Sequence, residues 1–305
     1  MKNKGHIAGI AFALIFGFSF MFSKIALEAN ITPMGVIAYR FLLAFLVFEI
    51  LRLTKIVKIR FHKEMIVPVL LVAFFQPILY FIFETYGLNL TTSSEAGMMI
   101  ALIPIFVTIL SSFILNEKPK KIQVLFIILS LSGIILIQVM KPNPEGEVST
   151  FLGFILLFLA VFSAASFNIA SRKASKTVKA YETTYYMMLT GAFIFNIIYI
   201  IQLVLNNNLN LYFSSISTID VMLPIMYLGI VASIGGFFLV NYALSKLPAH
   251  VSSIYANLST VVAVLAGHFI LGDELTVYTI IGGIMIILGV YGVARTNYKN
   301  QIPKG

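Results

Sequence analysis

Four ionisable side chains stand inside otherwise apolar stretches, and they are the first candidates for chemistry: Lys24, Arg40, Glu84 and Glu95. A charged side chain at the centre of a membrane helix costs roughly 2.5 to 3.5 kcal/mol on insertion scales, so each one requires a partner or a function. Two cations and two carboxylates can together bind both ends of a zwitterion. A carboxylate that faces a cation and an occluded cavity can also exchange a proton for substrate.

A structural interpretation of the same residues stays open. Lys24 and Glu84 can snorkel toward the headgroups, and the four charges can form an ion-pair network that only holds helices together. Arg40 lies about 10 Å along its helix from one end and about 13 Å from Glu49, so we expect it to pair with Glu84 or Glu95 of a neighbouring helix. In the functional interpretation, Glu84 is the coupling or substrate-ammonium carboxylate, and Lys24 or Arg40 meets a substrate carboxylate.

The second half of the chain offers neutral polar side chains instead: Asn168, Tyr242, Tyr255, Asn257 and His268. They can hydrogen-bond a polar ligand, or they can hydrogen-bond neighbouring helices. His268 has the same two interpretations, a proton relay or a satisfied polar contact. Three prolines inside apolar runs, Pro77, Pro104 and Pro224, are hinge candidates because each removes a backbone donor.

The elements that must position these side chains are membrane helices. Hydrophobic residues make up 59% of the chain and charged residues 11%, a composition that indicates lipid as the solvent. A crossing needs about 20 apolar residues. Ten such runs are expected: His6 to Glu28, Pro33 to Leu53, Met65 to Gly87, Ser94 to Leu115, Lys121 to Met140, Phe151 to Ser171, Tyr181 to Leu205, Val221 to Ser245, His250 to Leu271 and Leu275 to Ala294.

Basic residues are concentrated in every second loop between the predicted helices. The two chain ends and the basic run from Arg52 to Lys63 fall on one side, whereas the opposite loops contribute only Lys141. Basic loops stay in the cytoplasm, so both termini are expected inside, with an even number of crossings. The formal charge of +9 is therefore interpreted as topological, with the basic run touching acidic headgroups and no nucleic-acid partner.

An internal repeat divides the chain. Thr91 to Ile137 and Leu247 to Val293 align without a gap, which pairs Glu117 with Asp273 and Gly133 with Gly289. The predicted repeats are residues 1–141 and 142–305, with five helices each. Since five is odd, the halves would be inverted copies, an arrangement that recurs in secondary transporters with a substrate site between the repeats.

The order of short motifs across both halves resembles the ten-helix, EamA-type branch of the drug/metabolite transporter superfamily. The motifs are Phe22-Ser23-Lys24, Arg40-Phe41-Leu42-Leu43-Ala44, Tyr86 to Thr92 with Ala96 and Pro104, Leu115-Asn116-Glu117, Tyr242-Ala243-Leu244, Leu247-Pro248-Ala249, Tyr255-Ala256-Asn257-Leu258 and Leu271 to Thr276. The chain departs from the family pattern at Phe20, Ala164, Thr260 and Asp273.

The resemblance implies a carrier of small metabolites, frequently directed outward and including amino acids. It also implies a cavity between helices one, three and four of one half and six, eight and nine of the other. Alternatives stay open: an importer, a carrier of a nucleotide-sugar, amine or lipid precursor, or a sensor that does not transport.

The remaining residues favour no enzyme, metal or cofactor. Cysteine is absent, the four histidines are scattered, and no phosphate-binding glycine loop is present. The expected partners are a small-molecule substrate, the lipid bilayer and H+ as one candidate coupling ion, in a monomer or homodimer. A composition rich in Ile, Lys and Asn suggests an AT-rich bacterial genome, and the expected location is the bacterial inner membrane.

Overall fold

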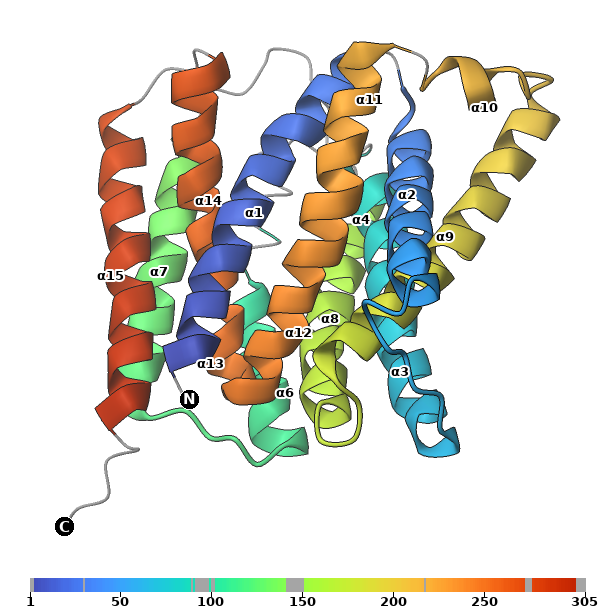
Figure 1. The fold of residues 1–305 in the computed structure, drawn as a ribbon. Coiled ribbons are helices and arrows are strands. Elements are labelled where there is room, and N and C mark those ends of the chain that lie inside the picture. The colour runs from blue at the N-terminus through green and yellow to red at the C-terminus, as the bar shows by residue number, and fades with distance from the viewer. Residues whose placement is uncertain are drawn as a thin grey trace.

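A computed structural model describes residues 3–29, 31–88, 90, 99, 102–140, 151–216, 218–271 and 276–299. In these residues the backbone forms helices joined by turns, without a strand. The helices stand roughly side by side as a bundle (Figure 1). We call the end of the bundle that holds Asn3 and the last residues of α15 the lower end, and the opposite end the upper end.

Six of the helices run as single α-helices: α1 (Asn3–Glu28), α2 (Pro33–Leu53), α7 (Lys121–Val139), α8 (Phe151–Ala174), α9 (Ala180–Leu205) and α15 (Val277–Lys299). Two shorter α-helices are α6 (Ile103–Ile114) and α10 (Leu211–Ser214).

Three further helices are built from consecutive segments that include a wider π-helical stretch. The first is η1 (Lys63–Met65), α3 (Ile66–Ala73), η2 (Phe74–Leu79) and α4 (Tyr80–Leu88). The second is α11 (Ile219–Met226), η3 (Tyr227–Gly236) and α12 (Phe237–Lys246), and the third is α13 (Ala249–Ser253), α14 (Tyr255–Ala266) and η4 (Gly267–Leu271).

Eight helices of the described residues are long and apolar enough to cross a membrane, and they correspond to eight of the ten predicted runs. The fourth and fifth predicted runs correspond to two shorter apolar helices, Ile103–Ile114 and Lys121–Ile137. Large apolar side chains such as Phe113 and Phe151, each 81% exposed, point outward from the bundle. The protein is therefore a multi-pass, all-helical membrane protein.

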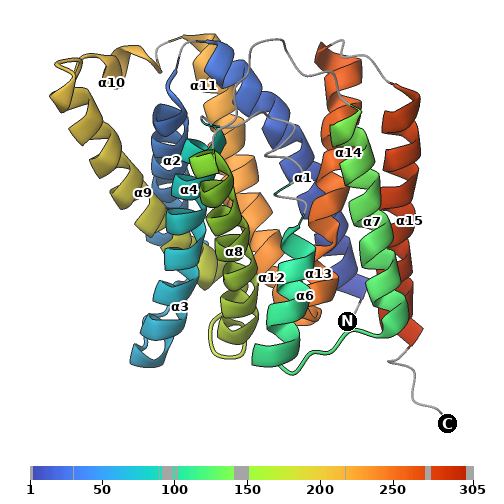
Figure 2. The same cartoon turned by 180° about the vertical axis from the view of Figure 1, so that it is seen from behind.

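Helices from the two halves of the chain pack against each other. α1 lies on α12 and α14, while α8 lies on α4 and α6; α2 packs on α9, and α7 packs on α15. If α1, α4 and α6 of the first half are exchanged for α8, α12 and α14 of the second half, the pairings of α1 become the pairings of α8. The α2–α9 and α7–α15 pairings map onto themselves. Figure 2 shows α7, α14 and α15 together at one side of the bundle and α9 leaning away at the other.

Small residues on α1 make close contact with α14. A Cβ on Gly9 would lie 2.6 Å from the Tyr255 ring, and one on Gly17 would lie 2.4 Å from Val262. Ala13, between them, is fully buried. This stripe serves helix packing, as small residues do in membranes.

The three prolines lie in different settings. Pro77 is inside η2, next to Gln76, whose φ of −151° and ψ of 120° are not helical. Pro224 is inside α11, just before η3. Pro104 falls in the first turn of α6, where a missing N–H breaks no bond, and not in the middle of a helix as the predicted run from Ser94 to Leu115 would have it. The hinge role itself stays a prediction for all three.

Glycines bring α7 and α15 into backbone contact. A Cβ on Gly133 would lie 2.5 Å from the carbonyl oxygen of Gly282, and a Cβ on Gly282 would lie 2.5 Å from that of Gly133. A Cβ on Gly289 would lie 2.6 Å from the carbonyl oxygen of Phe126. The sequence offset that takes Gly133 to Gly289 also takes Phe126 to Gly282, so one contact occurs twice.

Gly282→Ala is expected to destabilise the protein by about 1 to 3 kcal/mol, because the new methyl group overlaps a backbone oxygen and forces α7 and α15 apart. Thermal unfolding in detergent, followed by circular dichroism, measures the effect. Gly283→Ala is the matched control, because a Cβ there meets nothing nearer than 4.0 Å. Equal unfolding midpoints for the two variants would contradict the close contact.

Candidate functional site

Arg40 of α2 lies at the contact between the two halves of the chain. The side chain is 8% exposed, and its Nε donates to Ser233 Oγ of η3 at 2.6 Å. The guanidinium carbon lies 5.4 Å from the ring centroid of Phe81 and 5.8 Å from that of Phe41. Within the described residues, the two terminal nitrogens of Arg40 have no hydrogen-bond partner. The arrangement holds a desolvated cation that keeps free donors.

Glu84 of α4 is the carboxylate that interacts with this cation through charge in the described part of the chain. Its carboxylate accepts from the Tyr80 hydroxyl at 3.3 Å, and it is close enough to Arg40 for the two charges to attract each other. The two described side chains nevertheless form no direct ion pair. The prediction that Arg40 pairs with Glu84 or Glu95 stays open, because Glu95 lies outside the described residues. Toward Glu84 there is no salt bridge: the Arg40 Nε donates to Ser233 instead, and the two phenylalanine rings flank the guanidinium.

Local sequence explains why these elements meet. Gly229 lies one turn before Ser233 on η3, and a Cβ there would be 3.1 Å from the Arg40 carbonyl oxygen. The lack of a side chain lets α2 approach η3 closely, which brings Arg40 within reach of Ser233. Tyr80 and Glu84 are four residues apart on α4, so they share one face of that helix.

The side chains of two of the four predicted charged residues are not among those that the structure describes. Glu95 is outside the described residues. Lys24 belongs to α1, and the placement of its side chain is also outside the description. We therefore define the central cluster by the four side chains that the structure brings together: Arg40, Tyr80, Glu84 and Ser233.

Three of the neutral candidates make hydrogen bonds within the protein. Asn257 Nδ2 donates to Ser130 Oγ of α7 at 3.0 Å. Tyr255 OH and His6 Nδ1 are 2.6 Å apart, which joins α14 to α1. Asn168 Nδ2 donates at 2.8 Å to the Ala164 carbonyl of its own helix. The sequence left two interpretations of these residues open, hydrogen bonds to a ligand or hydrogen bonds within the protein. The structure contains hydrogen bonds of the second kind.

The other two candidates are separate from the central cluster. Tyr242 packs on Phe238 with ring centroids 6.0 Å apart, and Lys246 Nζ lies 5.6 Å from the Tyr242 ring. His268, in η4, lies edge-on to Phe269 with centroids 5.0 Å apart. None of the five neutral candidates has a described hydrogen bond to the Arg40 and Glu84 side chains.

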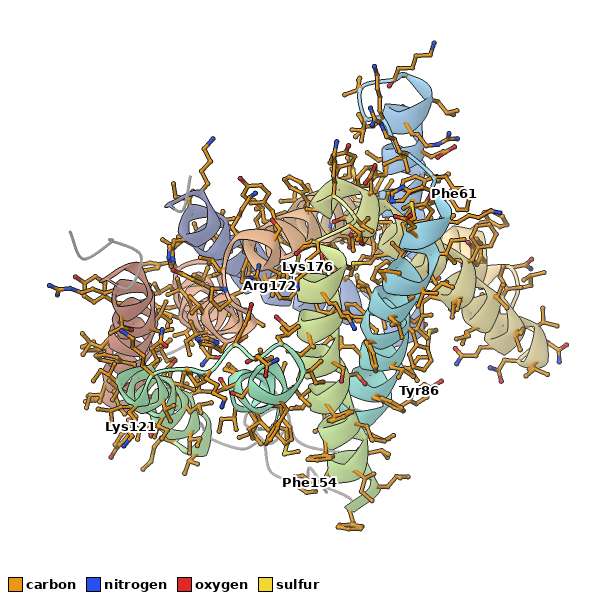
Figure 3. The ribbon with its side chains drawn as sticks, turned by 90° about the horizontal axis from the view of Figure 1, so that it is seen from below. Phe61, Tyr86, Lys121, Phe154, Arg172 and Lys176 are labelled. Carbon is orange, nitrogen blue, oxygen red and sulfur yellow. The ribbon has the colours of Figure 1, made fainter. Side chains whose placement is uncertain are left out.

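An ion pair joins the two halves at the lower end. Arg172 Nε, near the end of α8, donates to Glu117 Oε1 at 2.8 Å, and the two side chains are 23% and 19% exposed. Arg172 Nη1 also donates to the Leu244 carbonyl at 2.9 Å, and the Ala249 N–H donates to Glu117 Oε2 at 2.8 Å. Figure 3 shows Arg172 amid the helix ends, whereas Lys121 and Phe61 lie toward the rim. We call these groups the lower clamp.

The sequence placed Glu117 in a family motif, but it gave no indication that Glu117 meets Arg172. Sequence reasoning also missed Tyr80 and Ser233. The spacing of Tyr80 and Glu84 was a usable signal, because four residues is one helical turn. No comparable signal connects Arg172 to Glu117, since their contact depends on how two distant loops pack.

The described residues include no group of three or more His, Cys, Asp or Glu side chains that could hold a metal ion. The side chains of the central cluster, Arg40, Glu84 and their two hydroxyl neighbours, can recognise a ligand through charge and hydrogen bonds.

Comparison with known proteins adds the family. The model of the EamA-like transporter family matches residues 3–139 and 151–295. The uncharacterized transporter YcxC of Bacillus subtilis (strain 168) is 35% identical over 291 residues, which cover 95% of this chain and 93% of that protein. An uncharacterized transporter of Archaeoglobus fulgidus is 26% identical over 266 residues, covering 87% and 90% of the two chains.

A solved structure described as "Crystal structure of protein" has a TM-score of 0.78 and 15% identity, over 99% of this chain and 100% of that one, which shows a shared fold. The family match spans both halves, and the Bacillus relative covers nearly the full length. The resemblance seen in the sequence is thereby confirmed, and the chain belongs to the EamA-like transporter family.

Proposed function

We propose that this protein is a secondary active transporter that exports amino acids or related zwitterions by alternating access. The observation that carries the proposal is the central cluster, between helices of the two halves. There a buried guanidinium, whose terminal nitrogens have no partner among the described residues, lies near a carboxylate. Arg40 would bind the substrate carboxylate and Glu84 its ammonium group. Ser233 and Tyr80 hold the two charges in place.

We propose ten crossings with both termini in the cytoplasm. In support, the chain from Asn206 to Thr218 at the upper end has no lysine or arginine. The lower end has Lys55, Lys58, Arg60 and Lys63 between α2 and α3. Positively charged loops stay inside, so the lower end would face the cytoplasm. In a bacterium the membrane would be the inner membrane.

We further propose that residues 1–141 and 142–305 are inverted repeats. The family model matches the chain in two separate segments, and the α7–α15 contact at Gly133 and Gly282 recurs at Gly289 and Phe126. Inverted repeats allow one half to rock against the other around a site near the midplane. The central cluster lies between the halves, as such a mechanism requires.

Coupling to protons is part of the proposal. A carboxylate that is alternately open to water and enclosed by helices can carry a proton in one direction and release it for substrate in the other. Glu84 is half-buried and has only a neutral hydroxyl as its described hydrogen-bond donor, so it is free to change protonation during the cycle.

Counterflow in proteoliposomes tests the proposal. A panel of amino acids is screened one at a time and at two pH values. Vesicles loaded with an unlabelled amino acid that is a substrate are expected to take up its radiolabelled form in a saturable manner. Empty vesicles, and vesicles with a heat-unfolded sample, are the controls. If correctly folded protein exchanges no amino acid of the panel, the proposed substrate class is wrong.

A further inference from the structure

An apolar groove of about 470 Å³ opens on the outside of the bundle between α3 and α9, beside η2. Its lining includes Val67, Leu70, Leu71, Phe74, Thr190 and Ile194. Four of these side chains are largely open to the surroundings, with Val67 65%, Leu70 58%, Leu71 47% and Phe74 49% exposed.

The chemistry of the lining fits hydrocarbon. The only polar side chain in it is Thr190, whose hydroxyl donates to the Tyr186 carbonyl of its own helix at 2.7 Å. This bond turns the polar atom inward and leaves a methyl group for the groove. A polar ligand would find no hydrogen-bond partner in this lining and would lose its bonds to water, whereas an alkyl chain makes no hydrogen bonds and has none to lose.

The length of the groove matches one lipid chain. Its lining extends from Val67 to Ile78, which is about 16 Å at the rise of an α-helix. One leaflet supplies half of a hydrocarbon core of about 30 Å, so the groove spans the depth of a single acyl chain.

The lower mouth of the groove is closed by a small apolar cluster. Met65, Val69 and Val178 are buried there, with Tyr186 packed against them. These contacts hold the start of α3 against the start of α9. If the lower end faces the cytoplasm, as proposed, the headgroup region lies below these contacts, and a lipid headgroup would lie at this mouth.

A basic loop is held beside that mouth. Glu182, 2% exposed, accepts from the Arg60 N–H at 3.2 Å and from the Lys179 N–H at 3.1 Å. This buried side chain ties the loop to α9. The tie places the exposed cations Lys58, Arg60 and Lys63 next to the groove, with one exposed anion, Glu64, among them.

The same loop has the amphipathic character of a membrane interface. Ile56 is 72% exposed and Phe61 69% exposed, between the cationic side chains. Figure 3 shows Phe61 beside the lower end of α3. Exposed apolar and basic residues together are the pattern of a segment that lies among anionic headgroups.

We infer that the α3–α9 groove is a binding site for an anionic phospholipid, with one acyl chain in the groove and the phosphate on the basic loop. The site is outside the central cluster, and it is independent of what the protein transports. It gives the protein a preference for phosphatidylglycerol over phosphatidylcholine at one position of its lipid-facing surface.

The absence of tryptophan from the chain allows a clean test. Leu70→Trp places a single fluorophore in the groove, and Leu288→Trp places one on the lipid-facing side of α15, where Leu288 is 50% exposed. Each variant is reconstituted into phosphatidylcholine vesicles that contain either brominated phosphatidylglycerol or brominated phosphatidylcholine. Quenching gives the relative binding constant of the two lipids at each position.

In the Leu70→Trp variant, phosphatidylglycerol is expected to bind at the fluorophore about fivefold more tightly than phosphatidylcholine, which corresponds to about one net lysine contact. In the Leu288→Trp variant the ratio is expected to be near one. Replacing Lys58, Arg60 and Lys63 with glutamine, in the Leu70→Trp background, is expected to bring the first ratio down to the second.

Two results would overturn the inference. The first is a lack of lipid selection by the basic loop, seen either as an equal ratio in the two variants or as a preference that survives the three glutamines. The second is that brominated lipids quench the fluorophore on α15, whereas neither brominated lipid quenches the fluorophore in the groove. That result would show that protein, such as a second copy of the chain, covers the groove.

Discussion

Replacing Glu84 with glutamine is expected to lower amino-acid exchange by about tenfold or more, since a hydrogen bond to a charged group is worth about 1.5 to 3 kcal/mol. Glutamine keeps the shape of the side chain and its bond to Tyr80, but it offers no negative charge to a substrate ammonium group. It also cannot bind or release a proton. The same variant is therefore expected to lose the pH dependence of exchange.

Glu49→Gln is the matched control for that experiment. Glu49 is also a carboxylate inside a helix of the membrane region, and it accepts from Arg52 of the same helix and from Tyr185 at the lower end. The substitution is chemically identical but lies away from the central cluster. We expect its exchange rate and pH profile to match those of the original protein.

The structural alternative predicts a different pattern. If Glu84 only stabilises the buried cation, Glu84→Gln protein should unfold at a lower temperature, while the folded fraction exchanges substrate at the original rate and pH profile. Unfolding midpoints and exchange per folded molecule, measured on the same sample, separate the two interpretations. Unchanged exchange and pH profile in folded protein would refute the role proposed for Glu84.

The helices could be predicted well because the length of each apolar run can be counted directly in the sequence. Eight predicted runs are long apolar helices, and the repeat pairing of Gly133 with Gly289 reappears as matching contacts between α7 and α15. Periodicity and alignment carry this information without knowledge of the packing. The family followed from the order of short motifs and is confirmed by the family match.

The site was less predictable because partners depend on rotation and depth of the helices. Arg40 and Glu84 could be selected as costly charges, but nothing in their spacing indicated that Ser233 would bond Arg40 or that Phe81 would lie by its guanidinium. Asn257 illustrates the same limit. Its type suggested both a ligand and a helix partner, and only the packing shows Ser130 within 3.0 Å.

Glu117→Gln is expected to open the lower end of the protein. The Glu117 carboxylate holds Arg172 and the Ala249 N–H at once, so the lower clamp joins the α6–α7 connection to α8 and α13. Its side chains are 23% and 19% exposed, which places the pair between a surface ion pair of 0 to about 1 kcal/mol and a buried one of about 3 to 5 kcal/mol. A loss of about 2 kcal/mol would shift the balance between closed and open states about thirtyfold.

The residues behind the clamp favour opening once it is weakened. His250 is 4% exposed and Ser252 1% exposed, and neither His250 Nδ1 nor Ser252 Oγ has a hydrogen-bond partner in the described structure. Unpaired buried polar atoms cost free energy that water relieves when the end opens. In the proposed alternating-access cycle, closing of this end would therefore depend on the ion pair to offset this cost.

A single cysteine measures the opening, because the chain has none of its own. In a Ser252→Cys background, Glu117→Gln is expected to raise the rate of labelling by a membrane-impermeant maleimide at least about tenfold, as the loss of closing free energy requires. Glu64→Gln, which removes an exposed carboxylate at the same end, should leave the rate unchanged. If both substitutions give the original rate, the lower clamp does not hold the end closed, and closure must come from the apolar packing of α8, α12 and α13 alone.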